Sequence, residues 1–483
     1  MNGQHSLQDV RVALGFGAGA AALAGISALG LVERQRLLVA LVGFVLLLIV
    51  AGVLSARADA VFAGWMLLAP FLQNPYNPAT PRALIAVLYL VPPVLFALWT
   101  LASGRTETPR PGFRWFDALP LAFVVLALGS ILSQQLPITT FNSHGDWGQY
   151  VSRSYLGEIL YTNIGIGVIC YYFCAFGPRR RGFERRVVNA LLVTSAIVAF
   201  VALLERFSGT SLGGFLAKRE SKDGRVVGTF LDANALGGFL GVAIVIAVAV
   251  LIWRGPPSLR RPSIVMLVVG VPALAFTLTR AALLAVLAVV LLMASLHARV
   301  RWTALGAVAL TLVIGIASWS NIKATRVYQE RLSNRSNVAS RQLLTSWSLD
   351  LASRRPAMGW GYGSFDRVKS TVPLPSAGIP REYAASDTSH NTFLTVLVEL
   401  GSVGLALLLL PWLIIGYQAS RLGLRAVGRR WFVIAWVATL FVYVINASFS
   451  DFRFFSFVAA LPWIALGMLR RGMLAAEQPA APS

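Results

Sequence analysis

A histidine stands where the longest polar segment of the sequence meets an apolar run long enough to cross a membrane. His390 is followed at once by Asn391, and Glu399 is the only acidic residue in that run. Imidazole titrates near neutral pH, so this position suits a general base. The alternative is a helix cap, in which Ser389 or Asp387 starts a helix and His390 lies in its solvated first turn.

The other histidines are weaker candidates for catalysis. His5 lies in the N-terminal tail, and His297 adjoins an Arg-rich loop that the charge pattern assigns to the cytoplasm. His144 is expected on the same side as His390, but its turn-like loop SHGDWGQY has no basic neighbours. By elimination, His390 is the candidate general base.

Arginines form the second candidate group. Arg280 stands between two apolar runs with no other charge nearby. An arginine near membrane depth is costly and usually has an anionic partner, although a short-loop arginine can also snorkel to the surface. Arg225, Arg280 and Arg341 are all expected on the side of His390. One guanidinium group can donate two parallel hydrogen bonds to two oxygens of a phosphate. Three arginines on this side therefore indicate a phosphate-bearing ligand. The alternative for Arg341 is a solvated helix face.

Other kinds of chemistry lack their motifs. The sequence has no HExxH, no CxxC and no cluster of Asp or Glu with His, so we expect neither a metal nor a cofactor. A P-loop is absent, and a paired-carboxylate glycosidase mechanism lacks an obvious second carboxylate. Cys170 and Cys174, four apart in an apolar run, are interpreted as packing residues.

The composition indicates a polytopic membrane protein. Hydrophobic residues make up 57% of the 483 residues and charged residues only 13%, against about 25% charged residues in soluble domains. Backbone groups in lipid must bond within their own segment, so the fold class is all-α, with about 12–14 transmembrane helices. The apolar runs lie near 11–31, 37–54, 58–73, 84–103, 117–133, 157–177, 187–206, 236–253, 263–279, 281–297, 302–319, 391–416, 431–448 and 453–470.

The arginine distribution predicts the topology. The net charge is +22, and Arg clusters occupy alternate short loops, as in cytoplasmic loops of membrane proteins. Both termini and the loop 178–186 are therefore expected inside, and the segments 207–229 and 320–389 outside. We divide the chain into an N-terminal transmembrane bundle (1–319), a large periplasmic loop (320–389), and C-terminal transmembrane helices with a cytoplasmic tail (390–483).

The large loop is predicted to form a helical cap over the outer face of the membrane. Leu344, Trp347 and Leu351 share one face of an amphipathic helix over 341–356, which Pro356 stops. The stretch GWGYGSF (359–365) is a Gly-rich aromatic turn.

Taken in order, several stretches resemble the O-antigen ligase/polymerase superfamily. They are RVVGTFLDANALGGFL (225–240), LTRAALLAVL (278–287), RQLLTSWSLDLASRRPAMGWGYGSF (341–365) and SHNTFLTVLVELGSVG (389–404). The chain departs from the family pattern at Thr279, where serine is usual, and at Asp232, where proline is often seen.

This resemblance implies an inverting, metal-independent glycosyltransferase that takes a glycan from undecaprenyl diphosphate on the periplasmic face. His390 would activate the acceptor hydroxyl. Arg225 and Arg280 would bind the diphosphate, with Arg341 assisting. The supporting residues would orient loops and the ends of helices; they are Asn234, Asn391 and Glu399.

Within the family, ligation of O-antigen to lipid A–core is our first expectation. A chain polymerase or a protein O-oligosaccharyltransferase remains open. The partners would be the lipid-linked glycan donor, a glycan acceptor and membrane lipids, with no nucleic acid, in the bacterial inner membrane. A lipid-linked glycan transporter or flippase is an alternative of another class. It would place ionisable groups near the midplane and show repeat symmetry, whereas the sequence shows no repeat.

Overall fold

The computed structural model describes residues 58–71, 82–103, 112–134, 138–141, 147–151, 153–177, 182–208, 225–230, 232–297, 302, 336–371, 389–423 and 429–476. The first half contains α3 (Ala58–Leu68), η2 (Ala69–Phe71), α4 (Arg82–Ser103), η3 (Trp115–Ala118), α5 (Leu119–Ser133), β1 (Ile138–Phe141), β2 (Trp147–Val151), α6 (Arg153–Leu160), the π-helix η4 (Tyr161–Gly165), α7 (Ile166–Phe176) and α8 (Phe183–Ser208). The second half contains α10 (Ala233–Ile252), α11 (Pro257–Phe276), α12 (Arg280–Ser295), α15 (Ser336–Arg354), α16 (Phe365–Thr371), α17 (Thr392–Gly423), α18 (Arg430–Ala447), η8 (Phe452–Phe454) and α19 (Ser456–Ala476).

The predicted helical membrane fold is confirmed. Among the described residues, 7 helices are long and apolar enough to cross a membrane, and shorter apolar helices lie beside them. The protein is therefore a polytopic membrane protein. The runs near 11–31 and 37–54, and all but the first residue of the run 302–319, lie outside the described residues. An antiparallel hairpin of β1 and β2, with Ile138 opposite Val151, is a small exception to the helical fold.

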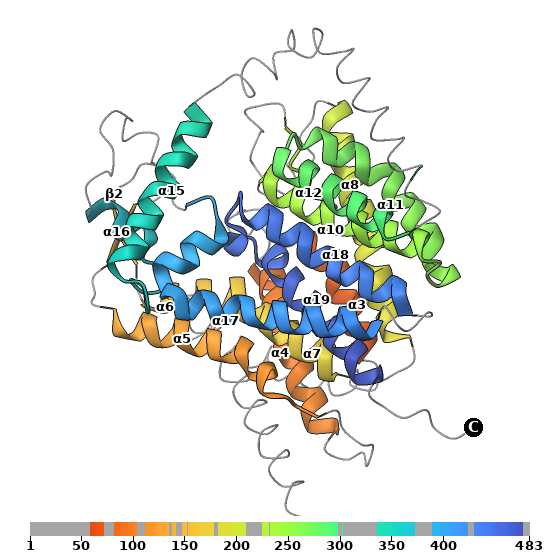
Figure 1. The fold of residues 1–483 in the computed structure, drawn as a ribbon, viewed down its shortest axis with the longest axis horizontal. Coiled ribbons are helices and arrows are strands. Elements are labelled where there is room, and N and C mark those ends of the chain that lie inside the picture. The colour runs from red at the N-terminus through yellow and green to blue at the C-terminus, as the bar shows by residue number, and fades with distance from the viewer. Residues whose placement is uncertain are drawn as a thin grey trace, which may run out of the picture.

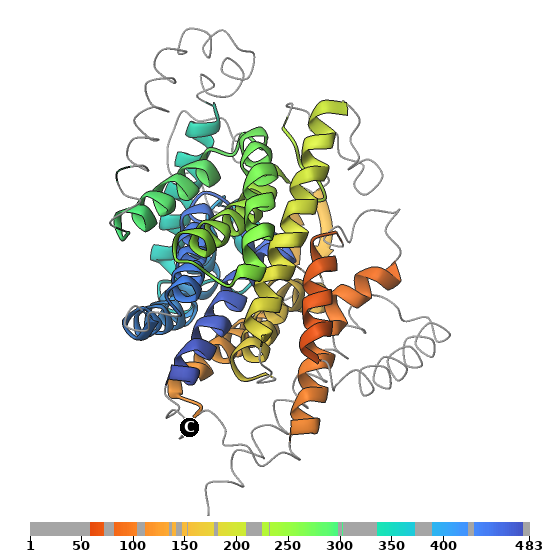
Figure 2. The same cartoon turned by 90° about the vertical axis from the view of Figure 1, so that its right-hand side faces the viewer.

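The helices form one bundle, in which α10 and α19 are the central members (Figures 1 and 2). Helix α19 packs against α7, α17 and α18, and α10 packs against α8, α11, α12 and α18. Exposed apolar side chains line the outer faces of α5, α11 and α12. An apolar outer face is what lipid solvates, so these helices form the periphery.

At one end of the bundle, charged side chains are buried between helices. Arg470 lies within α19, which continues past it to Ala476. Its Nε lies 2.9 Å from Oδ1 of Asp117, and both side chains are fully buried. Tyr171 also donates to this carboxylate, at 2.6 Å. A buried guanidinium needs such partners. Cys170 and Cys174 are buried and unpaired, as expected for packing residues.

The amphipathic helix predicted over 341–356 is present as α15, which ends two residues before Pro356. Leu344, Trp347 and Leu351 are buried on one face, in a cluster with residues of α16 and α17. In Figure 1, α15 and α16 lie together at one side of the bundle. Their packing on α17 places the helical part of the loop 320–389 directly beside His390.

Candidate functional site

His390 precedes α17 and does not lie in its first turn. The helix begins at Thr392, and the side chain of Asn391 caps it by accepting hydrogen bonds from Phe393 N at 3.0 Å and Leu394 N at 3.1 Å. Ser389 Oγ accepts from Asn391 N at 3.1 Å. The cap is thus Asn391. The alternative that Ser389 starts the helix is wrong, and Asp387 lies outside the described residues.

The backbone at His390 adopts a strained conformation. Its φ is +54°, in the left-handed region that side chains with a Cβ rarely adopt. Ser389 and Asn391 fix the chain on both sides, so the surrounding hydrogen bonds determine this geometry. Strain of this kind costs about 1–3 kcal/mol and collects at functional sites.

Arg225 is held rigidly against the connection between α11 and α12. Its Nε donates to the carbonyl oxygen of Thr277 at 2.7 Å, and its Nη2 donates to Thr279 Oγ1 at 2.7 Å and to Asn234 Oδ1 at 2.9 Å. Burial lowers the pKa of Arg225, and Asp232 opposes this effect. Asn234 therefore helps to orient the guanidinium of Arg225.

The two departures from the family pattern have structural explanations. Thr279 retains the hydroxyl of serine, which accepts from Arg225 and donates to Ala233 O at 3.0 Å. Asp232 is the N-cap of α10 and accepts from Asn234 N at 2.6 Å and Ala235 N at 3.2 Å. Thr279, the residue just before Arg280, is thus connected to the start of α10, whereas Asp232 caps α10 itself.

Arg280 is the first residue of α12, and its side chain is exposed. It follows the left-handed residue Leu278, which has a φ of +52°, and the buried Thr279. Arg280 therefore lies at the end of a largely apolar helix, next to Thr279, which accepts a hydrogen bond from Arg225.

Arg341 joins these two arginines from α15. Its Nη1 donates to the carbonyl oxygen of Phe449 at 2.8 Å. Burial lowers the pKa of Arg341, and the positive charges of Arg280 and Arg225 lower it further. The guanidinium group of Arg341 therefore lies close enough to those of Arg280 and Arg225 to feel their charge, although the three come from different segments. Such like charges repel in the absence of an anion.

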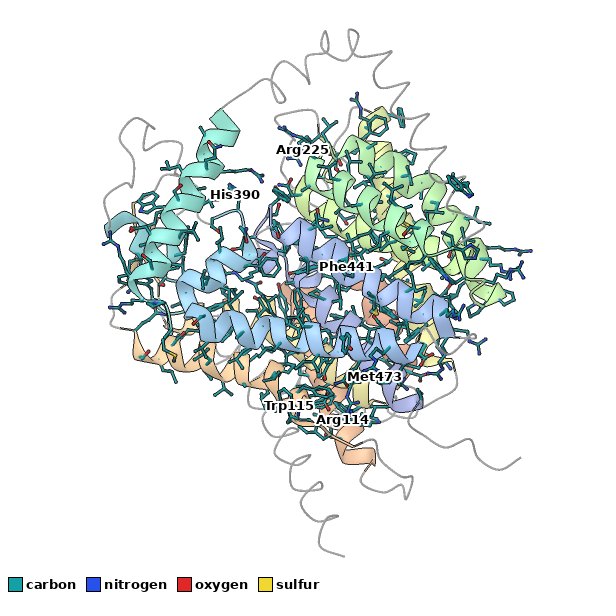
Figure 3. The ribbon with its side chains drawn as sticks, viewed as in Figure 1. Arg114, Trp115, Arg225, His390, Phe441 and Met473 are labelled. Atoms are coloured by element: carbon teal, nitrogen blue, oxygen red, sulfur yellow. The ribbon has the colours of Figure 1, made fainter. Side chains whose placement is uncertain are left out.

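The imidazole of His390 lies in the same electrostatic neighbourhood. Burial lowers its pKa, the charge of Arg341 lowers it further, and Asp451 and Asp232 act in the opposite direction. The unperturbed pKa is about 6.5, so a lowered value leaves the imidazole neutral at pH 7 and able to accept a proton. Figure 3 shows His390 and Arg225 toward one end of the bundle, and Arg114, Trp115 and Met473 toward the other.

Arg453 and Asp451, which the sequence analysis did not single out, form a buried ion cluster with Glu399. Arg453 Nη1 lies 2.6 Å from Glu399 Oε2, and its Nη2 lies 2.9 Å from Asp451 Oδ2. The Tyr362 ring lies beneath the guanidinium, 5.6 Å from Cζ. Asp451 and Arg453 lie at the border of the apolar run 453–470. Because charges near membrane depth need partners, this position could have indicated a buried ion pair.

The residues around this cluster connect α15, α17 and α18. Thr392 Oγ1 donates to Ser450 O at 3.0 Å and accepts from Phe452 N at 3.1 Å. The neighbouring carbonyl, that of Phe449, is the acceptor for Arg341. We call residues 448–455 the hub loop. It fixes Arg341 relative to the start of α17, where His390 lies.

Glu399 also lies at the interruption of α17, where the turn 356–361 forms backbone hydrogen bonds with the helix. Gly401 has a φ of +67° and interrupts the helix. There Gly361 N donates to Glu399 O at 2.7 Å, and Ser402 N donates to Pro356 O at 2.7 Å. The Gly-rich turn predicted at 359–365 thus bonds backbone to backbone with a membrane helix.

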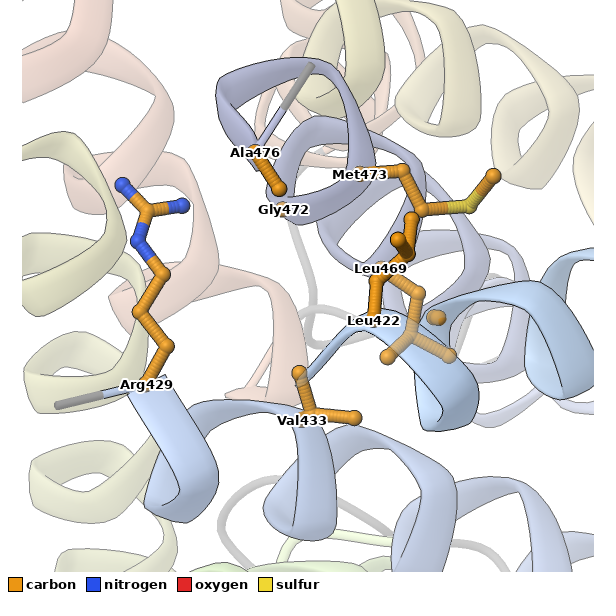
Figure 4. A pocket seen from close by; sticks show the side chains of 8 residues that line it. Leu422, Arg429, Val433, Leu469, Gly472, Met473 and Ala476 are labelled. Carbon is orange, nitrogen blue, oxygen red and sulfur yellow. The ribbon is translucent and has the colours of Figure 1, made fainter. Parts of the chain in front are cut away.

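The small pocket in Figure 4 lies away from this site. Leu422, Val433, Leu469, Met473 and other mainly apolar residues line it, together with Arg429, where α17, α18 and α19 meet. It contains none of the predicted site residues. His144 lies outside the described residues. Among the residues that the structure describes, no group of three His, Cys, Asp or Glu side chains could hold a metal ion.

The fold and site define a multi-pass membrane protein with a cluster of arginines and one neutral histidine toward one end of its helix bundle. Residues 265–409 match the family model described as O-antigen ligase, a family of lipid-linked glycan transferases. The predicted resemblance is therefore confirmed for this stretch, which includes Arg280, Arg341 and His390. Arg225 lies before it. A search of curated proteins found no match.

Proposed function

We propose that this protein is an inverting glycosyltransferase that moves a glycan from undecaprenyl diphosphate to an acceptor hydroxyl on the periplasmic face, with ligation of O-antigen to lipid A–core as the first candidate. The observation that carries the proposal is the place of Arg341, whose guanidinium feels the charges of Arg225 and Arg280 and itself acts on the neutral imidazole of His390. A diphosphate would relieve the mutual repulsion of the guanidinium groups. The imidazole can receive the proton that an attacking hydroxyl must lose.

The reaction needs one displacement. The acceptor oxygen attacks the anomeric carbon while its proton passes to His390, and the bond between that carbon and the diphosphate oxygen breaks. The leaving group takes the bonding electron pair and is neutralised by the arginines. Removing one such donor typically costs about 2.7–4 kcal/mol of transition-state stabilisation. Attack from the face opposite the leaving group inverts the anomeric configuration.

Arg225 and Arg280 have different parts in this scheme. Hydrogen bonds to Thr277, Thr279 and Asn234 preorganise Arg225, so little reorganisation is required when charge develops. Arg280 is exposed at the start of α12, where it can meet the lipid diphosphate. Arg341 assists from α15.

The direct test is transfer by purified protein from undecaprenyl-diphosphate-linked glycan to lipid A–core, repeated after exhaustive chelation. We expect transfer in both cases, because the arginines supply the positive charge. Loss of activity that Mg²⁺ or Mn²⁺ restores would overturn the metal-independent mechanism. Elongation of the lipid-linked glycan itself would identify a polymerase, and transfer to a polypeptide would identify a protein O-oligosaccharyltransferase. Movement of the donor between leaflets without transfer would identify a flippase.

A further inference from the structure

Glu205 is a carboxylate in the last turn of α8 that bonds to the backbone of the segment carrying Arg225. Its Oε2 accepts from Gly228 N at 2.7 Å and from Val227 N at 3.2 Å. Gly228 has a φ of +56°. This left-handed turn, which glycine adopts without strain, brings two successive N–H groups to one carboxylate oxygen.

Other contacts hold the same segment on its remaining sides. Val226 N donates to Phe276 O at 3.2 Å, and Thr229 Oγ1 donates to Pro70 O at 3.0 Å. The segment 225–230 is thus fixed to η2, α8 and α11. Of these contacts, the one to Glu205 involves a charged group, and charge-assisted hydrogen bonds are roughly twice as strong as neutral ones.

The position of this anchor determines what it can do for Arg225. The N–H groups that Glu205 binds are two and three residues beyond Arg225, while the guanidinium is held separately by Thr277, Thr279 and Asn234. The backbone anchor is therefore on α8, whereas the side-chain anchor comes from α10 and from the connection between α11 and α12. Glu205 thus holds the main chain just beyond Arg225, and Thr277, Thr279 and Asn234 hold its side chain.

We infer that Glu205 is a positioning residue for Arg225, acting through the backbone of residues 227 and 228 and touching neither substrate nor reacting atoms. The transfer readout of this inference rests on the proposed function, but its structural readout does not. A misplacement of about 1 Å can cost on the order of 10²-fold in rate. Loss of the carboxylate should therefore cost about 10- to 100-fold in kcat/KM for the lipid-linked donor.

The experiment compares Glu205→Ala, Glu205→Gln, Arg225→Ala and the double variant Glu205→Ala/Arg225→Ala in purified full-length protein. Backbone hydrogen exchange at residues 226–230 should be faster in Glu205→Ala than in the wild type. Glu205→Gln should recover part of the activity, because its amide oxygen still accepts from the segment. The double variant should transfer no more slowly than Arg225→Ala alone, since Glu205 acts through Arg225.

Glu184 provides a matched control in the first turn of the same helix. It lies 3.9 Å from Arg429, far along α8 from Glu205. Glu184→Ala should leave both exchange at 226–230 and the donor KM unchanged.

Unchanged exchange at 226–230 in Glu205→Ala would overturn the inference whatever the activity. A double variant clearly slower than Arg225→Ala would also overturn it, because the two losses would then be independent. If Glu205→Ala does not fold, Glu205→Gln decides: its neutral amide binds the segment more weakly than a carboxylate, so exchange at 226–230 should still be faster than in the wild type, and wild-type exchange would overturn the inference. If the wild type does not transfer glycan, the proposed function fails, and the exchange data alone test the positioning of the segment.

Discussion

At the residue scale, His390 carries the sharpest prediction. His390→Ala should lose about 10²–10⁴-fold in transfer, the usual contribution of a positioned general base, while it still binds the lipid-linked donor through the arginines. Transfer assays with a separate donor-binding measurement would check this. His144→Ala is the matched control and should be nearly silent. Wild-type transfer by His390→Ala, or a dead His144→Ala variant, would show that the base has been misassigned.

The pH dependence of transfer follows from the same imidazole. Only the neutral form accepts a proton, and burial together with Arg341 lowers the pKa of His390 from its ordinary value. Activity should therefore persist below pH of about 6.5 and fall only at more acid pH. Arg341→Ala removes one of these causes, so it should shift the acid limb toward higher pH. A rate profile of both proteins would measure the shift, and a limb that moves to lower pH would contradict this assignment.

Arg280 should contribute through the shape of its guanidinium as well as its charge. Arg280→Ala should lose most transfer without unfolding, and the expected loss is about 10²–10³-fold for one lost donor. Arg280→Lys should recover only part of it, because an ammonium cannot bind two oxygens with a planar fork. Steady-state kinetics, with thermal melts as the folding control, distinguish these outcomes. Full activity in Arg280→Ala would assign this residue to the snorkelling alternative.

At the element scale, the hub loop and the broken helix α17 hold the site together. Arg453→Ala would leave the carboxylates of Glu399 and Asp451 buried without their cation. Breaking a buried pair in this way typically costs about 3–5 kcal/mol of stability. Arg354→Ala is the control, because its pair with Asp350 is solvent-exposed and such pairs contribute about 0–1 kcal/mol. Denaturation in detergent should separate the two variants clearly, and equal midpoints would be evidence against a structural hub.

The insertion of the turn 356–361 into α17 depends on glycine at position 401. A Cβ there would clash with the backbone of Ala357 and Met358, and the residue has a positive φ. Gly401→Ala should therefore lower both the melting temperature and the transfer rate. Gly416 lies in the same helix, and a Cβ there would meet only Leu440 Cδ1, at 4.0 Å. Gly416→Ala should be tolerated, so similar damage by both substitutions would contradict the importance of the insertion.

At the scale of the whole molecule, the prediction concerns which end of the bundle faces the cytoplasm. Arginines cluster in the loop 178–186, whereas the proposed site lies beside the helices of the segment 320–389. In intact cells, a membrane-impermeant thiol reagent should not label the Arg180→Cys variant. The same reagent should label the Ser376→Cys variant. The native cysteines are buried and give little background. Labelling at position 180 would reverse the topology and move the proposed site to the cytoplasmic face.

The sequence alone determined the class of protein and the residues to consider. Long apolar runs must become helices in lipid, because no other open structure satisfies their backbone groups, and the described helices follow those runs closely. The motifs around Arg280, Arg341 and His390 carried the resemblance to the O-antigen ligase family, whose model matches residues 265–409, since residue types in order need no coordinates to be recognised. The amphipathic pattern of α15 was likewise readable, because one face of a helix repeats at a fixed interval.

The meeting of distant segments, in contrast, could not be predicted from the sequence. The partners of Arg225 come from α10 and from the connection between α11 and α12, and those of Arg453 come from α17 and the hub loop. No local pattern encodes such pairings, because hydrogen bonds between helices depend on how the helices pack. The interruption of α17 at Gly401 also required the structure, since glycine is common in membrane helices and its φ is set by the turn that enters there. The left-handed backbone of His390 is determined in the same way, by neighbours that fix the chain on both sides.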